Sequence, residues 1–396
     1  MQTVYLDNNA TTRTDPAVVE AMLPYFAEQF GNPSSAHAIG TGVAEGIRAA
    51  RSQVRSLIGA AHDQEIVFTS GGTESDNTAI LSGLQADPRR DEVVVSAVEH
   101  PAILTLCHHL ETSLGTRVHR IAVDGCGKMD MEAYKAALSG RTAIVSIMWA
   151  NNETGTVFPL EQLAAMAKRA GALFHTDAVQ AAGKLSMDLK TTAIDMLSLS
   201  AHKIHGPKGV GALYVRRGTP FAPLIHGGRQ ERARRAGTEN VPGIIGFGKA
   251  AERAMDALAL ETPRIARLRD RLEQGLQRSI VGIRVNGDPS ARLANTCNIA
   301  FEDVESDALL TLLGREGIAC SSGSACASGS MEPSHVLRAM QVPPPFLHGA
   351  LRFALSRDTR DTDIDRVLAV MPRIVERLRK PAPRPSRHQT SDLIHA

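Results

Sequence analysis

The sequence predicts an α/β protein that has a large, mostly parallel sheet and a second, smaller α+β domain. After residue 65, short apolar runs alternate with helical stretches, which is the pattern of strand–helix–strand units. The runs are aliphatic at successive positions, as expected of strands that are buried on both faces. With 396 residues, the chain also exceeds the length that one compact core usually holds.

The first predicted element is an amphipathic helix over residues 15–30. Asp15 can cap this helix, and Pro16 suits its first turn. The predicted apolar face holds Val18, Val19, Met22 and Phe26. The predicted strands of the sheet then follow at residues 66–68, 93–95, 143–148, 173–174, 196–199 and 211–217.

A second helix, predicted over residues 262–280, leads into the smaller domain. Thr262 is its expected cap and Pro263 its first residue, and apolar side chains recur along one face. Strands over residues 296–301 and 350–355 and helices over residues 307–314 and 364–379 follow. We therefore predict a large domain over residues 15–258, a small domain from residues 1–14 and 259–379, and a disordered tail over residues 380–396.

Composition and charge narrow the classes of function. The formal net charge of +2 gives no reason to expect nucleic acid or an anionic membrane as a partner. The chain contains no apolar run that could span a bilayer, and its first residues lack the pattern of a signal peptide. The five cysteines are odd in number and widely spread, without a CxxC pair. This indicates neither a disulfide framework nor a zinc site and favours the reducing cytoplasm.

The segment MLSLSAHKIHGPKGVG, residues 196–211, carries the most informative lysine. A predicted strand delivers Lys203 at its end, and a turn rich in Gly and Pro follows. Ligand sites of open α/β sheets lie at the carboxyl ends of strands. A lysine there can be partly withdrawn from water, which favours the neutral amine that attacks carbonyl groups. Taken alone, Lys203 would be interpreted as a solvated surface lysine, and Lys208 in the following turn is its rival.

Two further strand ends carry groups that suit the same ligand. The segment EIVFTSGGTESD, residues 65–76, places a turn at a helix start, where backbone N–H groups and the Thr73 hydroxyl can bind a phosphate. Asp177 follows the strand in FHTDAVQ, residues 174–180, and could pair with a protonated ring nitrogen. Each signal is weak by itself, because such turns and aspartates commonly cap helices. The prediction therefore depends on the phosphate turn, the acid and the lysine together.

Cys326 lies in SSGSACASGSM, residues 321–331, where every residue but the last is small. Such a stretch buries little side chain, so we predict a mobile loop that carries a thiol between a pocket and an acceptor. Cys107 and Cys297 lie in apolar contexts that favour small buried side chains instead. Cys320 ends a short apolar run and is also predicted to be structural.

Ten segments of the chain together resemble those of group I cysteine desulfurases, a family of class V, fold-type-I enzymes that use pyridoxal phosphate (PLP). They are YLDNNATT (5–12), FGNPSSAH (30–37), FTSGGTESDN (68–77), EHPA (99–102), ANNETG (150–155), HTDAVQ (175–180), SLSAHKIHGPKGVG (198–211), RRAGTEN (234–240), SSGSACASGSMEPSHVLRAM (321–340) and LRFALSR (351–357). The similarity is greatest to the NifS type, which is associated with nitrogenase maturation. It implies a large domain that contains a mostly parallel, seven-stranded sheet.

The resemblance implies a set of roles around the ring of PLP. Lys203 would carry the cofactor and later move the Cα proton of the substrate. Asp177 would contact the ring nitrogen, and Gln180 the ring hydroxyl. His100 would stack on the ring and could shuttle protons, although taken alone it is more often a hydrogen-bonded histidine.

Contacts with the phosphate and the substrate are implied in the same way. The residues that would bind the phosphate are Gly72, Thr73, Ser200 and His202, with Thr238 contributed by the partner subunit of a homodimer. Asn152, beside the cofactor, and Arg352 would bind the substrate carboxylate. The planar guanidinium of Arg352 suits that task because it can bind a carboxylate through two hydrogen bonds.

The implied activity converts L-cysteine to L-alanine. The Cys326 thiolate would take the sulfur as a persulfide and pass it to an iron–sulfur scaffold protein, without a catalytic metal. Contact between Cys326 and a nascent iron–sulfur cluster is compatible with the resemblance. Neither nucleic acid nor a membrane is expected to take part.

Three other functions are open on the sequence. A selenocysteine lyase or another PLP-dependent β-elimination lyase uses related chemistry, and the loop that carries Cys326 favours persulfide formation over both. An aminotransferase would leave Cys326 without a role. An inactive scaffold that binds iron–sulfur assembly proteins would not need Lys203, Asp177, His100 and Cys326 together.

Overall fold

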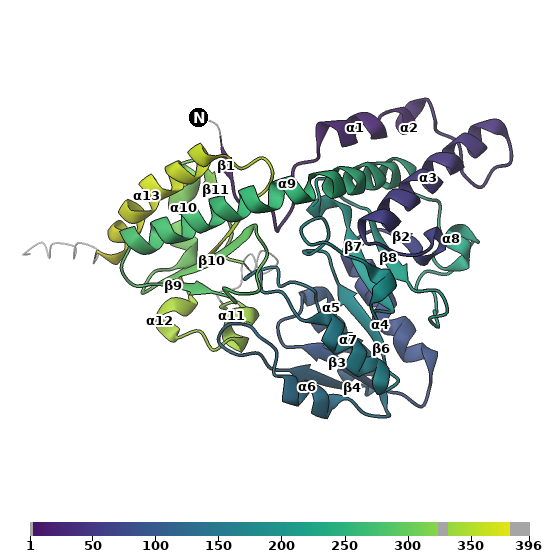
Figure 1. The fold of residues 1–396 in the computed structure, drawn as a ribbon, viewed down its shortest axis with the longest axis horizontal. Helices are drawn as coiled ribbons and strands as arrows, with labels where there is room; N and C mark the ends of the chain where they lie inside the picture. The colour runs from purple at the N-terminus through teal and green to yellow at the C-terminus, as the bar shows by residue number, and fades with distance from the viewer. Residues whose placement is uncertain (1–2, 324–331, 381–396) are drawn as a thin grey trace, which may run out of the picture.

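The computed structural model describes residues 3–323 and 332–380 of the chain. Two predictions fall outside these ranges: the loop that carries Cys326, of which residues 324–331 are not described, and the tail beyond residue 380. Figure 1 shows a broad sheet with its helices on one side of the molecule and a smaller group of strands and helices on the other. The long helix α9 joins the two groups.

The larger group is built on a seven-stranded sheet. In spatial order its strands are β2 (Ile66–Thr69), β8 (Gly211–Val215), β7 (Met196–Ser200), β6 (Leu173–Asp177), β5 (Thr142–Ser146), β3 (Glu92–Ser96) and β4 (Arg117–Ile121). β8 runs antiparallel to both of its neighbours, and the other pairs are parallel. The predicted mostly parallel sheet is therefore confirmed. The sequence patterns do not predict the edge strand β4, because its sequence RVHRI is largely polar.

The side chains of strand β3, which lies beside the edge strand β4, alternate between two apolar layers. Val94 packs into one layer with α3 (Ala38–Leu57) and α7 (Leu160–Arg169). Val93 and Val95 pack into the other layer with α4 (Gly72–Ala86) and α5 (Pro101–Leu114). Helices thus cover both faces of the sheet, which explains why its strands are apolar at successive positions.

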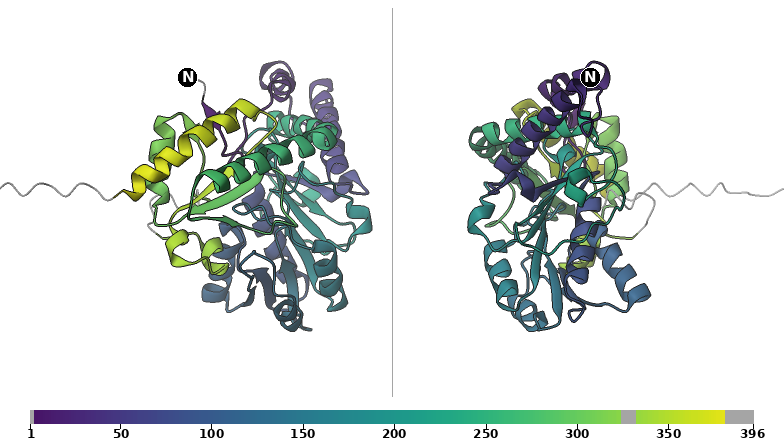
Figure 2. Two further views of the ribbon diagram at one scale, coloured as in Figure 1. Left: turned by 60° about the vertical axis from the view of Figure 1, so that its left-hand side comes forward. Right: turned by 90° about the vertical axis from the view of Figure 1, so that its right-hand side faces the viewer.

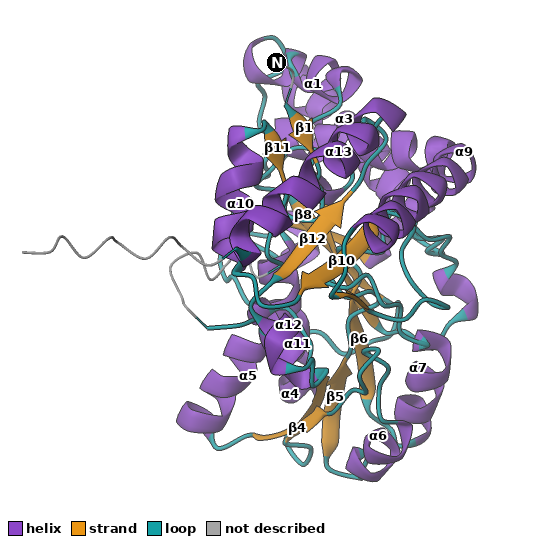
Figure 3. Ribbon diagram, turned by 90° about the vertical axis from the view of Figure 1, so that its left-hand side faces the viewer, coloured by secondary structure: helices purple, strands orange, loops and turns teal. Residues whose placement is uncertain are grey.

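The smaller group contains an antiparallel sheet with the order β12 (Ala350–Ala354), β10 (Thr296–Phe301) and β9 (Ile283–Asn286). A parallel pair, β1 (Val4–Tyr5) and β11 (Ile318–Ala319), ties the N-terminal segment to this group. Helices α10 (Ser306–Arg315) and α13 (Asp361–Arg379) lie over these strands, as Figure 3 shows, and enclose a separate apolar core. The two strands and two helices predicted from residue 296 onward are therefore present.

Helix α9 (Val241–Ser279) contradicts the predicted helix start at Thr262 and Pro263. Pro263 lies inside the helix, where it removes one backbone hydrogen bond at a cost of about 3 kcal/mol. The helix continues because both halves are buried: Phe247 packs in the large core, and Leu268 and Leu272 pack in the small one. Each buried side chain of this size contributes about 1.5–3 kcal/mol, so tertiary packing outweighs the local penalty. Figure 2 shows the helix extending along both groups.

The helix predicted over residues 15–30 is divided into α1 (Pro16–Met22) and α2 (Pro24–Ala27), because Pro24 has no N–H to continue the first helix. Asp15 caps α1 as predicted, since its Oδ1 accepts a 2.9 Å hydrogen bond from the Ala17 N–H. The predicted apolar face is wrong. Val18 is buried, whereas Phe26 is 63% exposed.

The short helices are α6 (Met131–Ala137), α8 (Gln230–Ala233), α11 (His335–Ala339) and α12 (Pro344–Leu347). In α8 the backbone departs from helical geometry, because Glu231 and Arg232 have positive φ angles of 46° and 58°. Across residues 3–323 and 332–380, no helix is both long and apolar enough to cross a membrane.

Candidate active site

The candidate site lies where strands β2, β6 and β7 end, at the carboxyl edge of the large sheet. Lys203 ends a single 3-10 turn, Ala201–Lys203, directly after β7. Its Nζ donates hydrogen bonds to the carbonyl oxygens of Asn9 (2.5 Å) and Ala10 (2.7 Å). The N-terminal segment therefore holds this amine in place, whereas the rival Lys208 is exposed.

Asp177 is buried and His100 is partly buried, and both lie within electrostatic range of Lys203. Burial raises the pKa of Asp177 above its usual range, opposed by a hydrogen bond from the Val179 N–H and by the positive charge of Lys203. His100 is the N-cap of α5, and its Nδ1 accepts a 3.1 Å hydrogen bond from the Ala102 N–H. Burial lowers the pKa of His100, so the ring is neutral at pH 7 and carries its hydrogen on Nε2.

A cavity of about 400 Å³ brings together four residues that the resemblance assigns to the phosphate, which are Gly72, Thr73, Ser200 and His202. It lies at the N-terminus of α4, where backbone N–H groups lack helical partners and the helix dipole favours an anion. Gly72 allows a close approach of the chain, because a Cβ on it would lie 2.9 Å from Val179 Cγ2. His202 is neutral, since burial lowers its pKa to about 4.

Thr238 does not line this cavity in its own chain. It lines a neighbouring cavity of about 180 Å³ that shares Ser70 and Gly209 with the first. The segment that carries Thr238 is tied to α4 by Arg235, whose Nε donates a 2.9 Å hydrogen bond to Glu74. Within a single chain, Thr238 therefore lies next to the cavity at the start of α4 but does not line it.

Gln180 is held by the N-terminal segment and by a lysine that the sequence patterns do not single out. Its Nε2 donates a 2.9 Å hydrogen bond to the Asn9 carbonyl oxygen, and its Oε1 accepts a 3.1 Å hydrogen bond from Lys184 Nζ. Burial, together with the positive charge of Lys203, lowers the pKa of Lys184 to about 7. The sequence does offer one signal for Lys184. Small residues precede it, and small residues allow the chain to pack tightly around a long side chain.

Arg352 is buried in strand β12, with 2% of its surface exposed. Its Nη2 forms an ion pair of 2.7 Å with Asp7, and its Nη1 donates to the carbonyl oxygens of Asn152 (3.0 Å) and Gly323 (3.3 Å). Arg352 Nε is buried and has no hydrogen-bond partner among the described residues. This donor, next to the half-buried Asn152, is left for a further acceptor such as a carboxylate.

The cysteines differ in burial as predicted. Cys107 and Cys297 are both 0% exposed and pack among apolar side chains. Cys320 packs against the small core, and burial raises its pKa to about 12. A thiol with this pKa is protonated at pH 7 and is a weak nucleophile, which supports a structural role for Cys320.

Asn9 contacts several residues of the site, and the sequence patterns do not single it out. It is 1% exposed, and its carbonyl oxygen accepts hydrogen bonds from both Lys203 and Gln180. Its Nδ2 donates to the Asn152 carbonyl oxygen (3.1 Å) and to Thr296 Oγ1 (2.9 Å). The paired asparagines in LDNNATT are the available signal, because a buried amide needs several hydrogen-bond partners.

Together these groups fit pyridoxal phosphate. The buried carboxylate of Asp177 would be stabilised by a protonated ring nitrogen, which would lower its raised pKa. The cavity at the start of α4 suits the phosphate, and the Lys203 amine lies at the end of a neighbouring strand. The uncharged ring of His100 can pack on a flat aromatic cofactor without the cost of burying an imidazolium ion.

Comparison with known proteins agrees with this geometry. Residues 4–367 match the family model described as aminotransferase class V. The chain is 63% identical to a cysteine desulfurase of Gluconacetobacter diazotrophicus and 56% identical to the cysteine desulfurase NifS of Azotobacter vinelandii. Both alignments cover 97% of this chain, and they cover 96% and 95% of those proteins.

A solved structure described as a NifS-like protein superposes with a TM-score of 0.89 at 36% identity, over 95% of this chain and 100% of that one. The NifS-like protein of Rickettsia africae superposes with a TM-score of 0.85 at 30% identity, over 95% and 100% of the two chains. Similarity in sequence and in fold therefore extends over nearly the whole chain. The chain belongs to the class V aminotransferase family and, within it, to the cysteine desulfurases.

Proposed function

We propose that this protein is a PLP-dependent cysteine desulfurase that converts L-cysteine to L-alanine and retains the sulfur as a persulfide on Cys326. The observation that carries the proposal is the convergence of Lys203, Asp177 and the phosphate cavity at the strand ends of one sheet. This convergence occurs in a chain that is 63% identical to a cysteine desulfurase.

Each residue of the site has a distinct task in this proposal. Bound PLP would delocalise the electrons that remain when a bond at the substrate Cα breaks. Lys203 would hold the cofactor and move the Cα proton with an amine that two backbone carbonyls orient. Asp177 would keep the ring nitrogen protonated, and His100 would hold a transferable proton on Nε2. Arg352 and Asn152 would orient the substrate carboxylate.

The sulfur step needs no external oxidant. The Cys326 thiolate attacks the substrate sulfur, and a new sulfur–sulfur bond forms. The bond from that sulfur to the substrate Cβ breaks, and its electron pair goes to the carbon skeleton, which is protonated to give alanine. One cysteine and one enzyme thiol thus give one alanine and one enzyme persulfide.

The described residues on either side of residues 324–331 support Cys326 as the sulfur acceptor. Gly323, whose carbonyl oxygen accepts a hydrogen bond from Arg352, lies three positions before Cys326. The described chain therefore reaches Arg352 three residues before the proposed sulfur acceptor. On the other side, His335 Nε2 donates a 2.9 Å hydrogen bond to the carbonyl oxygen of Glu99, which directly precedes His100.

Product analysis tests this function. Wild-type protein given L-cysteine and a thiol reductant should release alanine and sulfide in equal amounts. Cys326→Ala should keep the absorbance of bound PLP and release little alanine, whereas Cys320→Ala should lose little activity. Mass spectrometry after brief exposure to L-cysteine should place one extra sulfur on the peptide that contains Cys326. A persulfide on Cys320, or normal alanine release by Cys326→Ala, would overturn the assignment.

We also propose a homodimer in which each subunit contributes Thr238 to the phosphate of the other. Five large apolar side chains are 42–69% exposed, and a second copy would cover them: Val19, Leu23, Phe26, Phe30 and Ile39. The segment over residues 227–240 has little apolar content with which to fold by itself. Mixed dimers of Lys203→Ala and Thr238→Ala chains should regain activity through one intact site, and a catalytically competent monomer would contradict the shared site.

The remaining assignments follow from this chemistry and are likewise proposals. A large domain over residues 15–258 and a small domain from residues 1–14 and 259–379 are supported by a buried apolar cluster that draws only on residues 4–6 and 265–375. The Cys326 thiol must stay reduced to accept sulfur, and thiols stay reduced in the cytoplasm, so we propose the cytoplasm as the location. An iron–sulfur scaffold protein is the proposed acceptor, for cluster assembly that includes nitrogenase maturation.

A further inference from the structure

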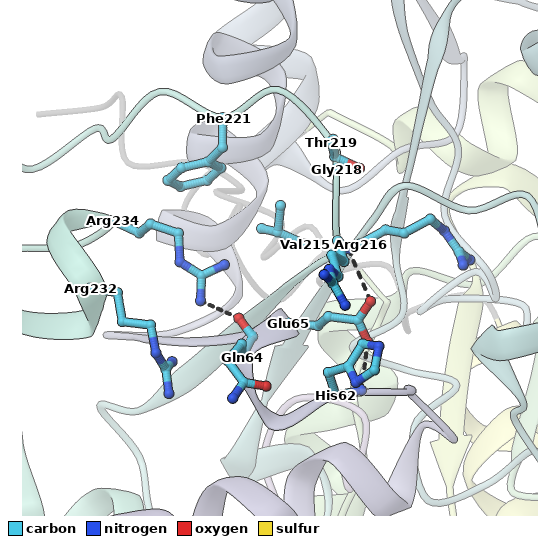
Figure 4. A pocket seen from close by; sticks show the side chains of 11 residues that line it. His62, Gln64, Glu65, Val215, Arg216, Gly218, Thr219, Phe221, Arg232 and Arg234 are labelled. Carbon is cyan, nitrogen blue, oxygen red and sulfur yellow. Dashed lines mark hydrogen bonds between the residues drawn. The ribbon is translucent and has the colours of Figure 1, made fainter.

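A second cavity, of about 570 Å³, lies at the opposite end of strand β2 from the phosphate turn. Figure 4 shows its lining, which comes from the start of β2, the end of β8 and the segment that includes α8. β2 has four residues and therefore spans about 13 Å between Glu65, which lines this cavity, and the turn that leads to Gly72. The cavity is thus distinct from the proposed PLP site.

The lining carries unbalanced positive charge. Arg217, Arg232 and Arg234 line the cavity together with one carboxylate, that of Glu65. Within the ranges that the structure describes, Arg217 and Arg232 form no ion pair and no side-chain hydrogen bond. Arg234 donates to the carbonyl oxygen of Gln64, which carries no full charge. The three guanidinium groups therefore exceed the carboxylate by two charges.

The side chains of Glu65 and Arg216 are both held by the protein itself and are not directed at a ligand in the cavity. The Glu65 carboxylate already accepts hydrogen bonds from the backbone N–H groups of Ala61 (3.0 Å), His62 (2.9 Å) and Arg217 (3.0 Å). Arg216 also lines the cavity, but its guanidinium donates to backbone carbonyl oxygens such as that of Ile194, and Figure 4 shows it pointing away from Arg232 and Arg234.

A strained turn presents two of these arginines. Glu231, Arg232 and Ala233 have φ angles of 46°, 58° and 60°, in the left-handed region that costs about 1–2 kcal/mol per residue. The turn is held by a buried ion pair in which Arg51 bonds Glu231 at 2.6 and 2.7 Å. Strain of this kind persists where the surroundings enforce it, commonly at ligand-binding segments.

The positive charges of Arg232 and Arg234 also repel each other. Burial, together with the positive charge of Arg232, lowers the pKa of Arg234 to about 10. An anion in the cavity would relieve this repulsion. Phe221 lines the same cavity and offers an apolar surface beside the charges.

We propose that this cavity binds a small molecule that carries a phosphate group, at a site separate from PLP. A phosphate monoester dianion neutralises the two excess charges, and guanidinium groups bind phosphate oxygens through paired hydrogen bonds. The volume of about 570 Å³ exceeds that of the phosphate alone, so the organic part of the molecule would lie against Phe221.

Calorimetric titration of the PLP-loaded protein with inorganic phosphate and with glycerol 3-phosphate tests the proposal. Bound PLP keeps the probe out of the phosphate turn, and ionic strength is held constant with chloride. Arg217→Gln and Arg232→Gln remove side chains that make no ion pair within the described residues, so folding should be unaffected. Each loses a charged hydrogen bond and should weaken binding of both probes by about 10-fold to 100-fold.

Arg315→Gln is the matched control, because it removes the same charge from an exposed position on α10. It should bind both probes as the wild type does. Absence of saturable binding, or equal binding by wild type, Arg217→Gln and Arg232→Gln, would overturn the proposal. No L-cysteine is present, so the result does not depend on whether the protein releases alanine.

Discussion

Replacement of Arg352 by glutamine should weaken the binding of amino acids about 10-fold to 150-fold. Hydrogen bonds to charged groups are worth about 1.5–3 kcal/mol, and about 1.4 kcal/mol corresponds to a factor of ten. The structure places the expected loss toward the upper end of this range. Asp7 is paired with Arg352 at 2.7 Å, and after the substitution its negative charge would repel the incoming carboxylate.

Two ligands, one with a carboxylate and one without, distinguish loss of the carboxylate contact from a general disturbance of the site. L-alanine and ethylamine differ by the carboxylate, and both can be titrated against the absorbance of bound PLP. The ratio of their dissociation constants should change in Arg352→Gln by the factor given above. Arg352→Lys should recover part of the loss, because an ammonium group cannot form the paired hydrogen bonds.

Arg292→Gln is the control for loss of a buried ion pair. Arg292 bonds Glu273 at 2.8 Å, and its side chain is 5% exposed, compared with 2% for Arg352. This variant should leave the ratio of the two dissociation constants unchanged. If Arg352→Gln weakens L-alanine and ethylamine equally, the guanidinium supports the structure of the site and does not bind the carboxylate.

Two further predictions concern the lysine and a buried acid. Lys203→Ala should abolish turnover and bind PLP without a covalent bond, whereas Lys208→Ala should retain PLP covalently after borohydride reduction; the opposite result by mass spectrometry would exchange the two lysines. Burial raises the pKa of Glu99 from 4.5 to about 8, so the native state retains a proton that the unfolded chain releases. The resulting stabilisation is fully present below pH 4.5 and is lost as the pH rises to about 8. Glu99→Gln cannot titrate, so its Tm relative to wild type should rise between pH 5 and pH 8, and a constant difference would contradict the raised pKa.

The sequence predicts the site best where the fold itself determines position. Asp177 ends strand β6 and Lys203 follows strand β7 by three residues, and parallel strands of one sheet end at the same edge. Their convergence therefore follows from two local patterns and one rule of topology. The start of α9 could not be predicted in this way, because Thr262 and Pro263 form a good local helix start that burial of the preceding half overrides.

Contacts between distant segments are the part that local patterns cannot supply. The hydrogen bond from Lys203 to Asn9 joins residues 194 positions apart, and the ion pair of Arg352 with Asp7 joins residues 345 positions apart. Lys184 is missed for the same reason, since a lysine in a turn is usually solvated. Its burial depends on the surrounding tertiary packing.

Both of these distant contacts are made to the N-terminal segment, through Asn9 and Asp7. The parallel pair of β1 with β11 fixes the segment to the small group, and the chain continues from β11 to Gly323 and Cys326. Two positions beyond Asp7, the carbonyl oxygen of Asn9 accepts the hydrogen bond from Lys203. Lys203, Arg352 and the start of the cysteine segment are therefore connected through one strand pair. A shift of β11 against the large sheet would move Asp7 and Asn9 together, so binding of the carboxylate and orientation of the lysine amine should change together.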